Sequence, residues 1–464
     1  MSETPDSPTS NKWPDYQAVW RWHFYAGIFT MPFIVVLSIS GAIYLFKPQI
    51  EAWNDRAYDN LTLNGAPVSA AVQVQAALAA FPGSTTASYE LPGRTNDAAR
   101  VIVRHHGKSI RVYLHPESSQ ILHSAPEDER FMRTVFRLHG ELLIGERGSN
   151  IVELAASWTI IMILTGLYLW WPRQSSGLGG ILYPRLRKGS RIFWRDIHSV
   201  TGVWISTLAL FLLLTGLPWA KFWGGYFKKV RSLTGTAVVK QSWSTGSDSP
   251  SAGQKKGSGG HGGHGSGKKN SGVMPSDFAA FDRIASTVQP MGLESPVVIS
   301  PPTSVSSDEW AVKSTTQNRP KRASFVVEGK TGRIISSEYF KDLHWVDRTV
   351  STGVAAHEGQ LFGWPNQLLG LLVSLGLLLL SVSGAIMWWK RRDEGVLGAP
   401  SMALSPRISW GLITVIVLLG IYLPMFGASL LLVILAERFV LSRIPKIQTW
   451  LGLPPRSTSH EADR

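Results

Sequence analysis

No cysteine occurs among the 464 residues, and this absence excludes several classes of site. Disulfide scaffolds, Cys-ligated iron–sulfur clusters, zinc ribbons and covalent c-type haem all need cysteine. The sequence also lacks a P-loop, and no G-x-G-x-x-G motif opens a helix after a strand. Thiol chemistry is therefore excluded, and no nicotinamide or ATP site is expected within this chain.

Charged residues are absent from five long apolar runs, which dominate the organisation of the chain. The runs cover residues 22–46, 154–172, 197–220, 359–389 and 408–436. Each is close to or above the roughly 20 residues that cross a bilayer as a helix. The sequence therefore predicts a polytopic α-helical membrane protein. Two long polar stretches, 47–150 and 221–356, are each large enough for a small folded domain.

Basic residues in the short loops predict the orientation in the membrane. From Arg173 to Asp196 there are six Arg or Lys residues against one acid, and Lys390 begins a second basic loop. Basic loops stay in the cytoplasm, so we expect a cytoplasmic N-terminus and both polar stretches outside. No cleavage pattern precedes the first run, which predicts an anchor. This topology and a basic linker account for the net charge of +14, and nucleic-acid binding is not expected.

The fifth apolar run has two interpretations. Residues 408–441 are interrupted at Leu423-Pro424, and the tail beyond them is basic. A single span would leave this tail outside, whereas two short spans that turn at Pro424 would return it to the cytoplasm. We adopt the second interpretation, which gives about six spans.

The two halves of the chain repeat one another. A His and a later Gly are 18 residues apart at one place in each half and 27 residues apart at another, and the pairs are His23 with Gly41, His198 with Gly216, His139 with Gly166, and His357 with Gly384. This internal duplication predicts two parallel repeats, about 20–173 and 195–392, related by an axis along the membrane normal.

The outer stretch of each half repeats an order of elements. Residues 68–81 and 276–288 are expected to be helices, and alternating runs at 99–105, 109–114, 310–314 and 323–328 predict strands. We therefore expect two small α+β modules. The Gly/Ser/Lys tract 240–273 is expected to be a disordered linker. His261 and His264 in this tract could instead catch a metal or an anionic chelate, but the linker explains them better.

The expected organisation is a series of spans joined by outer and inner segments. The spans are 20–46, 139–173, 197–220, 357–390 and the hairpin 408–441; the outer modules are 47–138 and 221–356; the cytoplasmic segments are 174–196, 391–407 and the tail 442–464.

The order and spacing of these motifs resemble a known family. The features are the apolar runs with His at their ends, the Leu138-His139-Gly140 and His357-Glu358-Gly359 motifs, the paired Trp residues at 170–171 and 388–389, and the strand, Thr-Gly turn, strand modules. They are similar to those of the PepSY-associated transmembrane proteins, which include PiuB-like iron-uptake proteins and FoxB-type ferric-siderophore reductases. The resemblance covers about residues 20–439. It implies a bacterial inner-membrane protein with periplasmic PepSY modules and, in the reductase members, two b-type haems between the helices.

Four of the twelve histidines lie at span ends. His23 and His198 are at the cytoplasmic starts of the first and third spans, whereas His139 and His357 are on the outer side before the second and fourth. Two neutral imidazoles from facing helices at one depth can hold a non-covalent haem. We therefore predict an inner haem on the first pair and an outer haem on the second. A lone interfacial His more often hydrogen-bonds or snorkels, so this prediction depends on the duplicated register and on the resemblance.

Small and basic residues near these histidines each have two interpretations. Some glycines could admit a flat macrocycle or could serve close helix packing, and they are Gly27, Gly202, Gly166 and Gly384. Some arginines precede a predicted ligand and could face haem propionates, and they are Arg21, Arg137 and Arg195. The positive charge of cytoplasmic loops explains Arg21 and Arg195 equally well.

The predicted function is electron transfer across the membrane by a haem-dependent oxidoreductase. Electrons would come from quinol or a cytoplasmic flavoprotein and reach a periplasmic acceptor. The family's link to iron uptake makes a ferric siderophore the leading acceptor, because Fe(II) binds hard oxygen chelators more weakly than Fe(III). Superoxide, a cupric complex or a partner cytochrome are alternative acceptors. A non-redox scaffold whose outer modules bind a peptide, protease or envelope partner is the alternative from another class.

Overall fold

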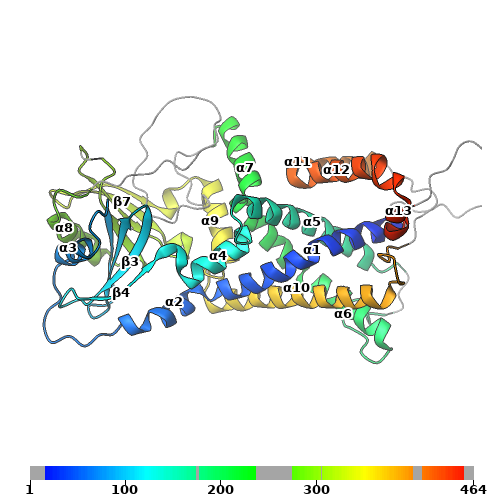
Figure 1. The fold of residues 1–464 in the computed structure, drawn as a ribbon, viewed down its shortest axis with the longest axis horizontal. Coiled ribbons are helices and arrows are strands. Elements are labelled where there is room, and N and C mark those ends of the chain that lie inside the picture. Colours follow the sequence, from blue (N-terminus) through cyan, green and yellow to red (C-terminus); the bar gives the residue numbers. More distant parts are fainter. Residues whose placement is uncertain (1–15, 174–176, 237–273, 305, 401–409, 454–464) are drawn as a thin grey trace, which may run out of the picture. The chain divides into compact units, whose positions relative to one another are not determined.

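The computed structural model describes residues 16–173, 177–236, 274–304, 306–400 and 410–453 (Figure 1). The predicted linker 240–273, with His261 and His264, lies outside these described residues. The chain divides into two compact units. The first contains residues 1–42, 139–230 and 371–464, and the second contains residues 43–138 and 231–370.

Long apolar helices form the first unit. In the described part of the chain, five helical segments are long and apolar enough to cross a membrane: Tyr16–Leu45, Glu146–Trp170, Ser190–Trp219, Trp364–Arg391 and Pro424–Arg443. Four of them correspond to the first four apolar runs, and the fifth covers the second half of the run 408–436, so the prediction of a multi-pass membrane protein is confirmed.

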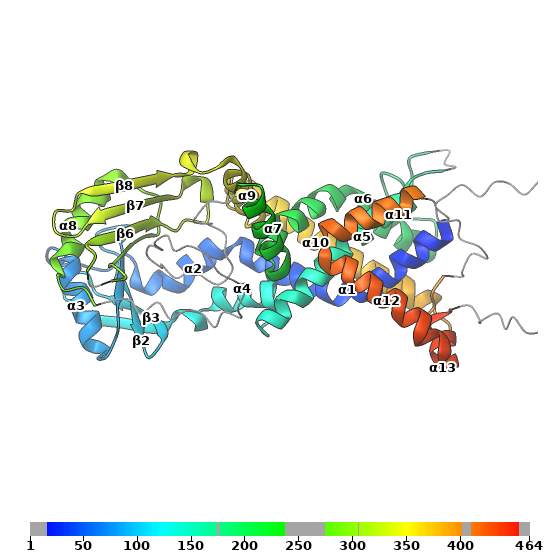
Figure 2. The ribbon, with the colours of Figure 1, turned by 90° about the horizontal axis from the view of Figure 1, so that it is seen from above.

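Four of these helices run alongside one another in both views (Figures 1 and 2), and they are α1 (Tyr16–Leu45), α5 (Glu146–Trp170), α6 (Ser190–Gly216) and α10 (Trp364–Arg391). Within each half of the duplication, the first span packs on the second. A Cβ added at Gly27 of α1 would lie 3.8 Å from Met162 Sδ of α5. At the equivalent Gly202 of α6, it would lie 3.7 Å from Leu380 Cδ2 of α10. The repeat in sequence is therefore also a repeat in helix packing.

A helical hairpin follows the bundle. Helices α11 (Trp410–Tyr422) and α12 (Pro424–Phe439) meet at Leu423, as the sequence predicted. Gly420 and Gly427 let their backbones approach closely, since a Cβ at Gly427 would lie 2.9 Å from the Gly420 carbonyl oxygen. With 13 and 16 residues, the helices are about 20 and 24 Å long, which is short for a hydrocarbon core of about 30 Å.

The segment after the hairpin returns to the end of the bundle where α1 begins. Helix α13 (Pro445–Leu451) lies there, because Tyr25 of α1 donates a hydrogen bond to the Leu451 carbonyl at 2.6 Å. The Leu397 amide, in the segment that follows α10, donates to the Trp450 carbonyl at 2.9 Å. The hairpin therefore ends near the point where α10 ends, which is the arrangement expected if it turns at Pro424.

A buried carboxylate joins the hairpin region to the bundle. Glu153 of α5 is only 2% exposed, and it accepts hydrogen bonds from the amides of Phe222 and Trp223 at 2.9 and 3.0 Å. These amides begin α7 (Lys221–Leu233), where the first turn of a helix leaves donors without partners. The Trp223 indole then donates to the Tyr422 carbonyl of α11 at 2.9 Å. Glu153 thus caps a helix that the sequence analysis did not predict.

One antiparallel sheet of eight strands forms the centre of the second unit. The strands are β1 (Ala87–Glu90), β2 (Ala99–His105), β3 (Lys108–Leu114), β4 (Ile121–Pro126), β5 (Val297–Ser300), β6 (Glu309–Ser314), β7 (Ala323–Glu328) and β8 (Ile334–Tyr339), in the order β4-β3-β2-β1-β5-β6-β7-β8. Helices α3 (Ala70–Ala80) and α8 (Ala279–Val288) contribute Val74 and Phe281 to the core shared with the sheet. The predicted helices and strands are therefore present, but the two expected modules share a single sheet.

The two repeats join at the centre of this sheet. Strand β1 pairs with β5 through Tyr89 opposite Ile299. On the helical side, the Ala71 amide of α3 donates to the Asp282 carboxylate of α8 at 2.9 Å. Strands β1 and β5 were not predicted, because each has four residues, all buried, and so lacks the alternation that marks a half-exposed strand.

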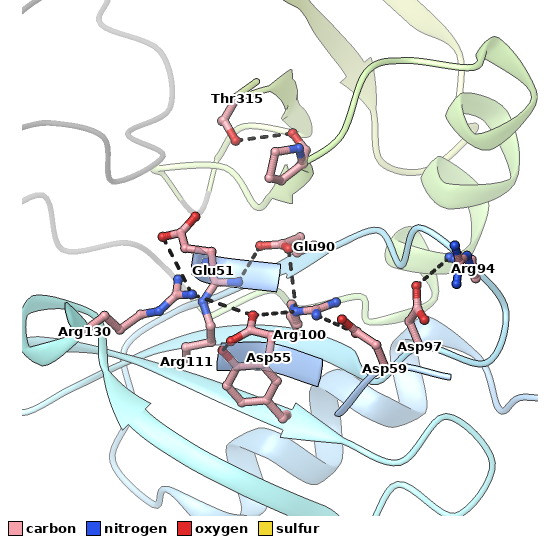
Figure 3. A network of polar contacts seen from close by, with 12 residues as sticks. Glu51, Asp55, Asp59, Glu90, Arg94, Asp97, Arg100, Arg111, Arg130 and Thr315 are labelled. Atoms are coloured by element: carbon pink, nitrogen blue, oxygen red, sulfur yellow. Dashed lines mark hydrogen bonds and ion pairs between the residues drawn. The ribbon is translucent and has the colours of Figure 1, made fainter. Parts of the chain in front are cut away.

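In the first repeat, a network of ion pairs covers the face of the sheet opposite helices α3 and α8 (Figure 3). Arg100, Arg111 and Arg130 lie among five carboxylates, which belong to Glu51, Asp55, Asp59, Glu90 and Glu127. Arg111 contacts Glu90 at 2.7 Å, and both side chains are 11% exposed. Burial alone would lower the pKa of Arg111, but Glu90 and Glu127 raise it well above its ordinary value. The network connects α2 (Lys47–Asp55) to strands β1, β2 and β3.

We expect Arg111→Met to lower the free energy of unfolding by about 3–5 kcal/mol, because it leaves the carboxylate of Glu90 buried without one of its cations. The matched control is Lys108→Met, since Lys108 and Glu129 form a pair whose side chains are 69% and 65% exposed. That change should cost about 0–1 kcal/mol. Denaturant unfolding of the purified full-length protein measures both values. Equal losses would contradict a stabilising role for the buried network.

Candidate metal centre

The structure brings two of the four predicted ligands together inside the first unit. His23 of α1 and His198 of α6 have ring centroids 6.4 Å apart, with ring planes at 86°. Both side chains are half-buried. They lie on the first span of each repeat at equivalent positions, as the duplicated spacing predicted. Their role as metal ligands stays a prediction.

Each imidazole is held by the second span of its own half. His23 Nδ1 lies 3.0 Å from the Met162 carbonyl oxygen and 3.1 Å from Thr165 Oγ1. In the second half, the same contacts recur, and the contacted residues are Leu380 and Ser383, each 218 positions after Met162 and Thr165. His198 Nδ1 lies 3.1 Å from the Leu380 carbonyl oxygen and 3.1 Å from Ser383 Oγ. The two sites are therefore built in the same way, which leaves the Nε2 atom of each ring for another partner.

Glycines make room for the two rings. A Cβ at Gly166 would lie 3.0 Å from His23 Cε1, and a Cβ at Gly384 would lie 3.5 Å from His198 Cε1. These two glycines thus accommodate an imidazole, which is neither of the interpretations that we had given them. A Cβ at Gly27 or Gly202 would meet only one side-chain atom, at ordinary van der Waals distance. Gly27 and Gly202 therefore lie at ordinary contact distance from the second span of their own half.

The other two predicted ligands end short helices. His139 lies in the last turn of α4 (Phe131–Glu141), and its Nδ1 is 3.1 Å from Ser40 Oγ of α1. A Cβ at Gly41 would lie 3.1 Å from His139 Cε1. His139 is thus held by a hydroxyl and a following glycine, as His23 and His198 are. His357 is the last residue of α9 (Trp345–His357), in the second unit. The pairing of His139 with His357 stays a prediction.

The donor set of the inner pair fits a haem. Two imidazoles that bind one metal from opposite sides, with bonds of about 2 Å, have ring centroids about 6 Å apart, and the rings of His23 and His198 are 6.4 Å apart. No group of three or more His, Asp or Glu that could hold a bare ion occurs in the described residues. A porphyrin brings four ligands of its own, so two imidazoles complete the coordination of its iron.

Two of the three arginines considered for propionates are used elsewhere. Arg21 is 7% exposed, and it donates hydrogen bonds to the carbonyls of Pro400, Leu451 and Gly452. Arg195 contacts the carboxylate of its neighbour Asp196 at 2.8 Å. Arg21 therefore binds α13 and the segment after α10, so these two residues do not support a propionate site.

Three hydroxyl residues that contact the imidazoles were not predicted from the sequence. Their signal was visible, because a Ser or Thr stands directly before each glycine of the repeat, at Ser40, Thr165, Thr215 and Ser383. Only the glycines had been used. Only the folded structure shows that three of these hydroxyls lie beside imidazole rings.

A comparison with protein families identifies the chain. The model of the PepSY-associated TM region matches residues 20–391. The chain belongs to this family. The match extends over the sheet and over the helices that contain all four histidines, and it ends before the α11–α12 hairpin. No curated protein matches the sequence.

We expect Gly166→Ala to displace the His23 ring, because the new Cβ would lie 3.0 Å from Cε1. This distance is shorter than an ordinary van der Waals contact, so the ring must move. A haem held by this pair would be bound less well, and its low-spin spectrum would change. Gly384→Ala is the matched control, since its Cβ would lie at an ordinary 3.5 Å from His198. Haem content and electron paramagnetic resonance of the purified variants measure the difference. Equal behaviour of the two variants would show that ring crowding is unimportant.

Proposed function

We propose that this family member is a di-haem b reductase of the bacterial inner membrane. The observation that carries the proposal is the facing pair His23 and His198, with the same hydrogen bonds to each Nδ1. His23 and His198 would hold the inner haem. By the duplicated spacing, His139 and His357 would hold the outer one. Haem supplies one-electron transfer, and the absence of cysteine makes both groups non-covalent.

We place the N-terminus in the cytoplasm and count six crossings, with the α11–α12 hairpin as two short ones. Three arginines at the end where α1 begins support this orientation. Arg391 lies 5.0 Å from the Trp20 ring and Arg392 lies 4.2 Å from the Trp389 ring, while Arg173 stacks on aromatic rings nearby. Arginine over interfacial aromatic rings is typical of a membrane surface, and basic residues favour the cytoplasmic one. The sheet unit would then be periplasmic.

The acceptor that fits best is a ferric siderophore in the periplasm. A one-electron donor suits Fe(III), whose reduction weakens its bonds to the oxygen ligands of the chelate and releases the metal. Electrons would enter from quinol or a cytoplasmic flavoprotein. The residues of the chain would hold the two groups at different membrane depths and exclude water around them. The chain itself would contact membrane lipid, with no role for nucleic acid.

The first test is the cofactor itself. We expect about two non-covalent haems per chain in detergent-purified protein, because two pairs of ligands are available. A pyridine haemochrome assay measures the content. His23→Ala and His198→Ala should each remove the same haem and spare the other. A colourless wild-type protein would contradict the proposal and favour a scaffold whose sheet unit binds a peptide, protease or envelope partner.

The second test is the acceptor. Dithionite-reduced protein should be reoxidised by a ferric siderophore and yield Fe(II), which a chromogenic Fe(II) chelator detects. In cells supplied with the ferric chelate, His139→Ala and His23→Ala should each stop release, because electrons must pass both haems in series. Unchanged release in His139→Ala cells would argue against the siderophore as the acceptor, even if the haems were present.

A further inference from the structure

We infer that three hydroxyl side chains are positioning residues, which fix the tautomer and the rotation of the predicted haem ligands. They are Thr165 for His23, Ser383 for His198, and Ser40 for His139. The inference rests on the proposed function and deepens it, because it assigns a role to groups that do not bind iron themselves.

The hydrogen bonds around His23 decide which ring nitrogen carries the proton. The Met162 carbonyl oxygen, 3.0 Å from Nδ1, can only accept a hydrogen bond, so Nδ1 must donate. Thr165 Oγ1 is also an acceptor here, because its own hydrogen is directed to the Ile161 carbonyl at 2.8 Å. Nδ1 therefore carries the hydrogen, and Nε2 keeps the lone pair that a metal needs.

The second half reaches the same result with a different hydroxyl residue. The Leu380 carbonyl oxygen lies 3.1 Å from His198 Nδ1, and Ser383 Oγ directs its hydrogen to the Leu379 carbonyl at 2.7 Å. Thr in one repeat and Ser in the other leave the hydroxyl as the feature that the two sites share. The methyl group of Thr165 is thus not essential to the arrangement.

The outer ligand His139 repeats the pattern on another helix pair. Ser40 Oγ lies 3.1 Å from His139 Nδ1 and directs its hydrogen to the Val36 carbonyl at 2.7 Å. As at the inner sites, the residue after the hydroxyl is a glycine, Gly41, whose missing side chain leaves room for Cε1. The hydroxyl at Nδ1 and the glycine that follows it therefore recur at three sites, on α1, α5 and α10.

Ser and Thr often bond a carbonyl of the preceding turn in membrane helices without any further role. Thr159 of α5 is such a residue: it is buried, and its hydroxyl donates to the Ala155 carbonyl at 2.7 Å. Among the described residues, no contact of Thr159 with an imidazole is seen, and the residue after it is Ile160. The contact to Nδ1 and the following glycine distinguish Thr165 from Thr159. Thr159 is therefore the natural control.

A hydrogen bond donated by Nδ1 makes a ligating imidazole more basic and so favours the ferric state. Removing the Thr165 hydroxyl should then move the midpoint potential of the inner haem to a more positive value, while the outer haem stays unchanged. Ser40→Ala should shift only the midpoint potential of the outer haem, also to a more positive value, and leave the inner one unchanged. Thr165→Ser distinguishes this role from a purely structural one, because it removes the methyl group and its packing but keeps the hydroxyl that contacts Nδ1.

The experiment compares Thr165→Val, Thr165→Ser and Thr159→Val in the full-length, haem-loaded protein. Redox titration gives the midpoints, and electron paramagnetic resonance gives the low-spin signals. We expect Thr165→Val to shift the inner midpoint and signal, and Thr165→Ser and Thr159→Val to match the wild type. If Thr165→Val loses the inner haem while Thr165→Ser retains it, the requirement for the hydroxyl is supported more strongly. An unchanged midpoint and signal in Thr165→Val, or the same change in Thr165→Ser, would overturn the inference. Absence of haem from the wild type would instead overturn the proposed function.

Discussion

Within each repeat, a hydrogen bond from an imidazole on one span to the backbone of the next sets the distance between the two helices. His23 reaches the Met162 carbonyl of α5 at 3.0 Å, and His198 reaches the Leu380 carbonyl of α10 at 3.1 Å. Such contacts require close packing at that level, and a glycine beside each ring allows it. The two pairs, α1 with α5 and α6 with α10, are thus each held together by an imidazole. When α1 packs beside α6, the rings of His23 and His198 come to 6.4 Å.

The pairing of the two repeats in a single sheet follows from the need to satisfy backbone hydrogen bonds. In two separate modules, β1 and β5 would each be an edge strand with unpaired amide and carbonyl groups, and exposed edges promote unwanted association. Their pairing removes both edges and places the strand of one repeat beside its own duplicate. The contact between α3 and α8 across the same line, through Ala71 and Asp282, then belongs to the one core that the repeats share.

The two repeats have diverged on the sheet face opposite these helices. Glu90 stands opposite Arg100 in the pairing of β1 with β2, whereas the corresponding pair of β5 with β6 is Ser300 and Ala311. The ion-pair network is therefore a property of the first repeat. The strands are thus common to both repeats, whereas the charged pairs on this face are not. A small or apolar pair avoids the desolvation energy that a buried ion pair costs.

Much of this protein could be predicted from its sequence, because membrane spans and duplications are local patterns. The apolar runs indicate helices since a bilayer requires about 20 apolar residues in a row, and equal spacings indicated that His23 and His198 are equivalent. Only the tertiary structure decided which atoms meet. Thr165 became a partner of His23 across 142 residues, and β1 joined β5 although neither has a periodic signal. Contacts between distant segments depend on how helices and strands pack, and a spacing along one segment does not contain that information.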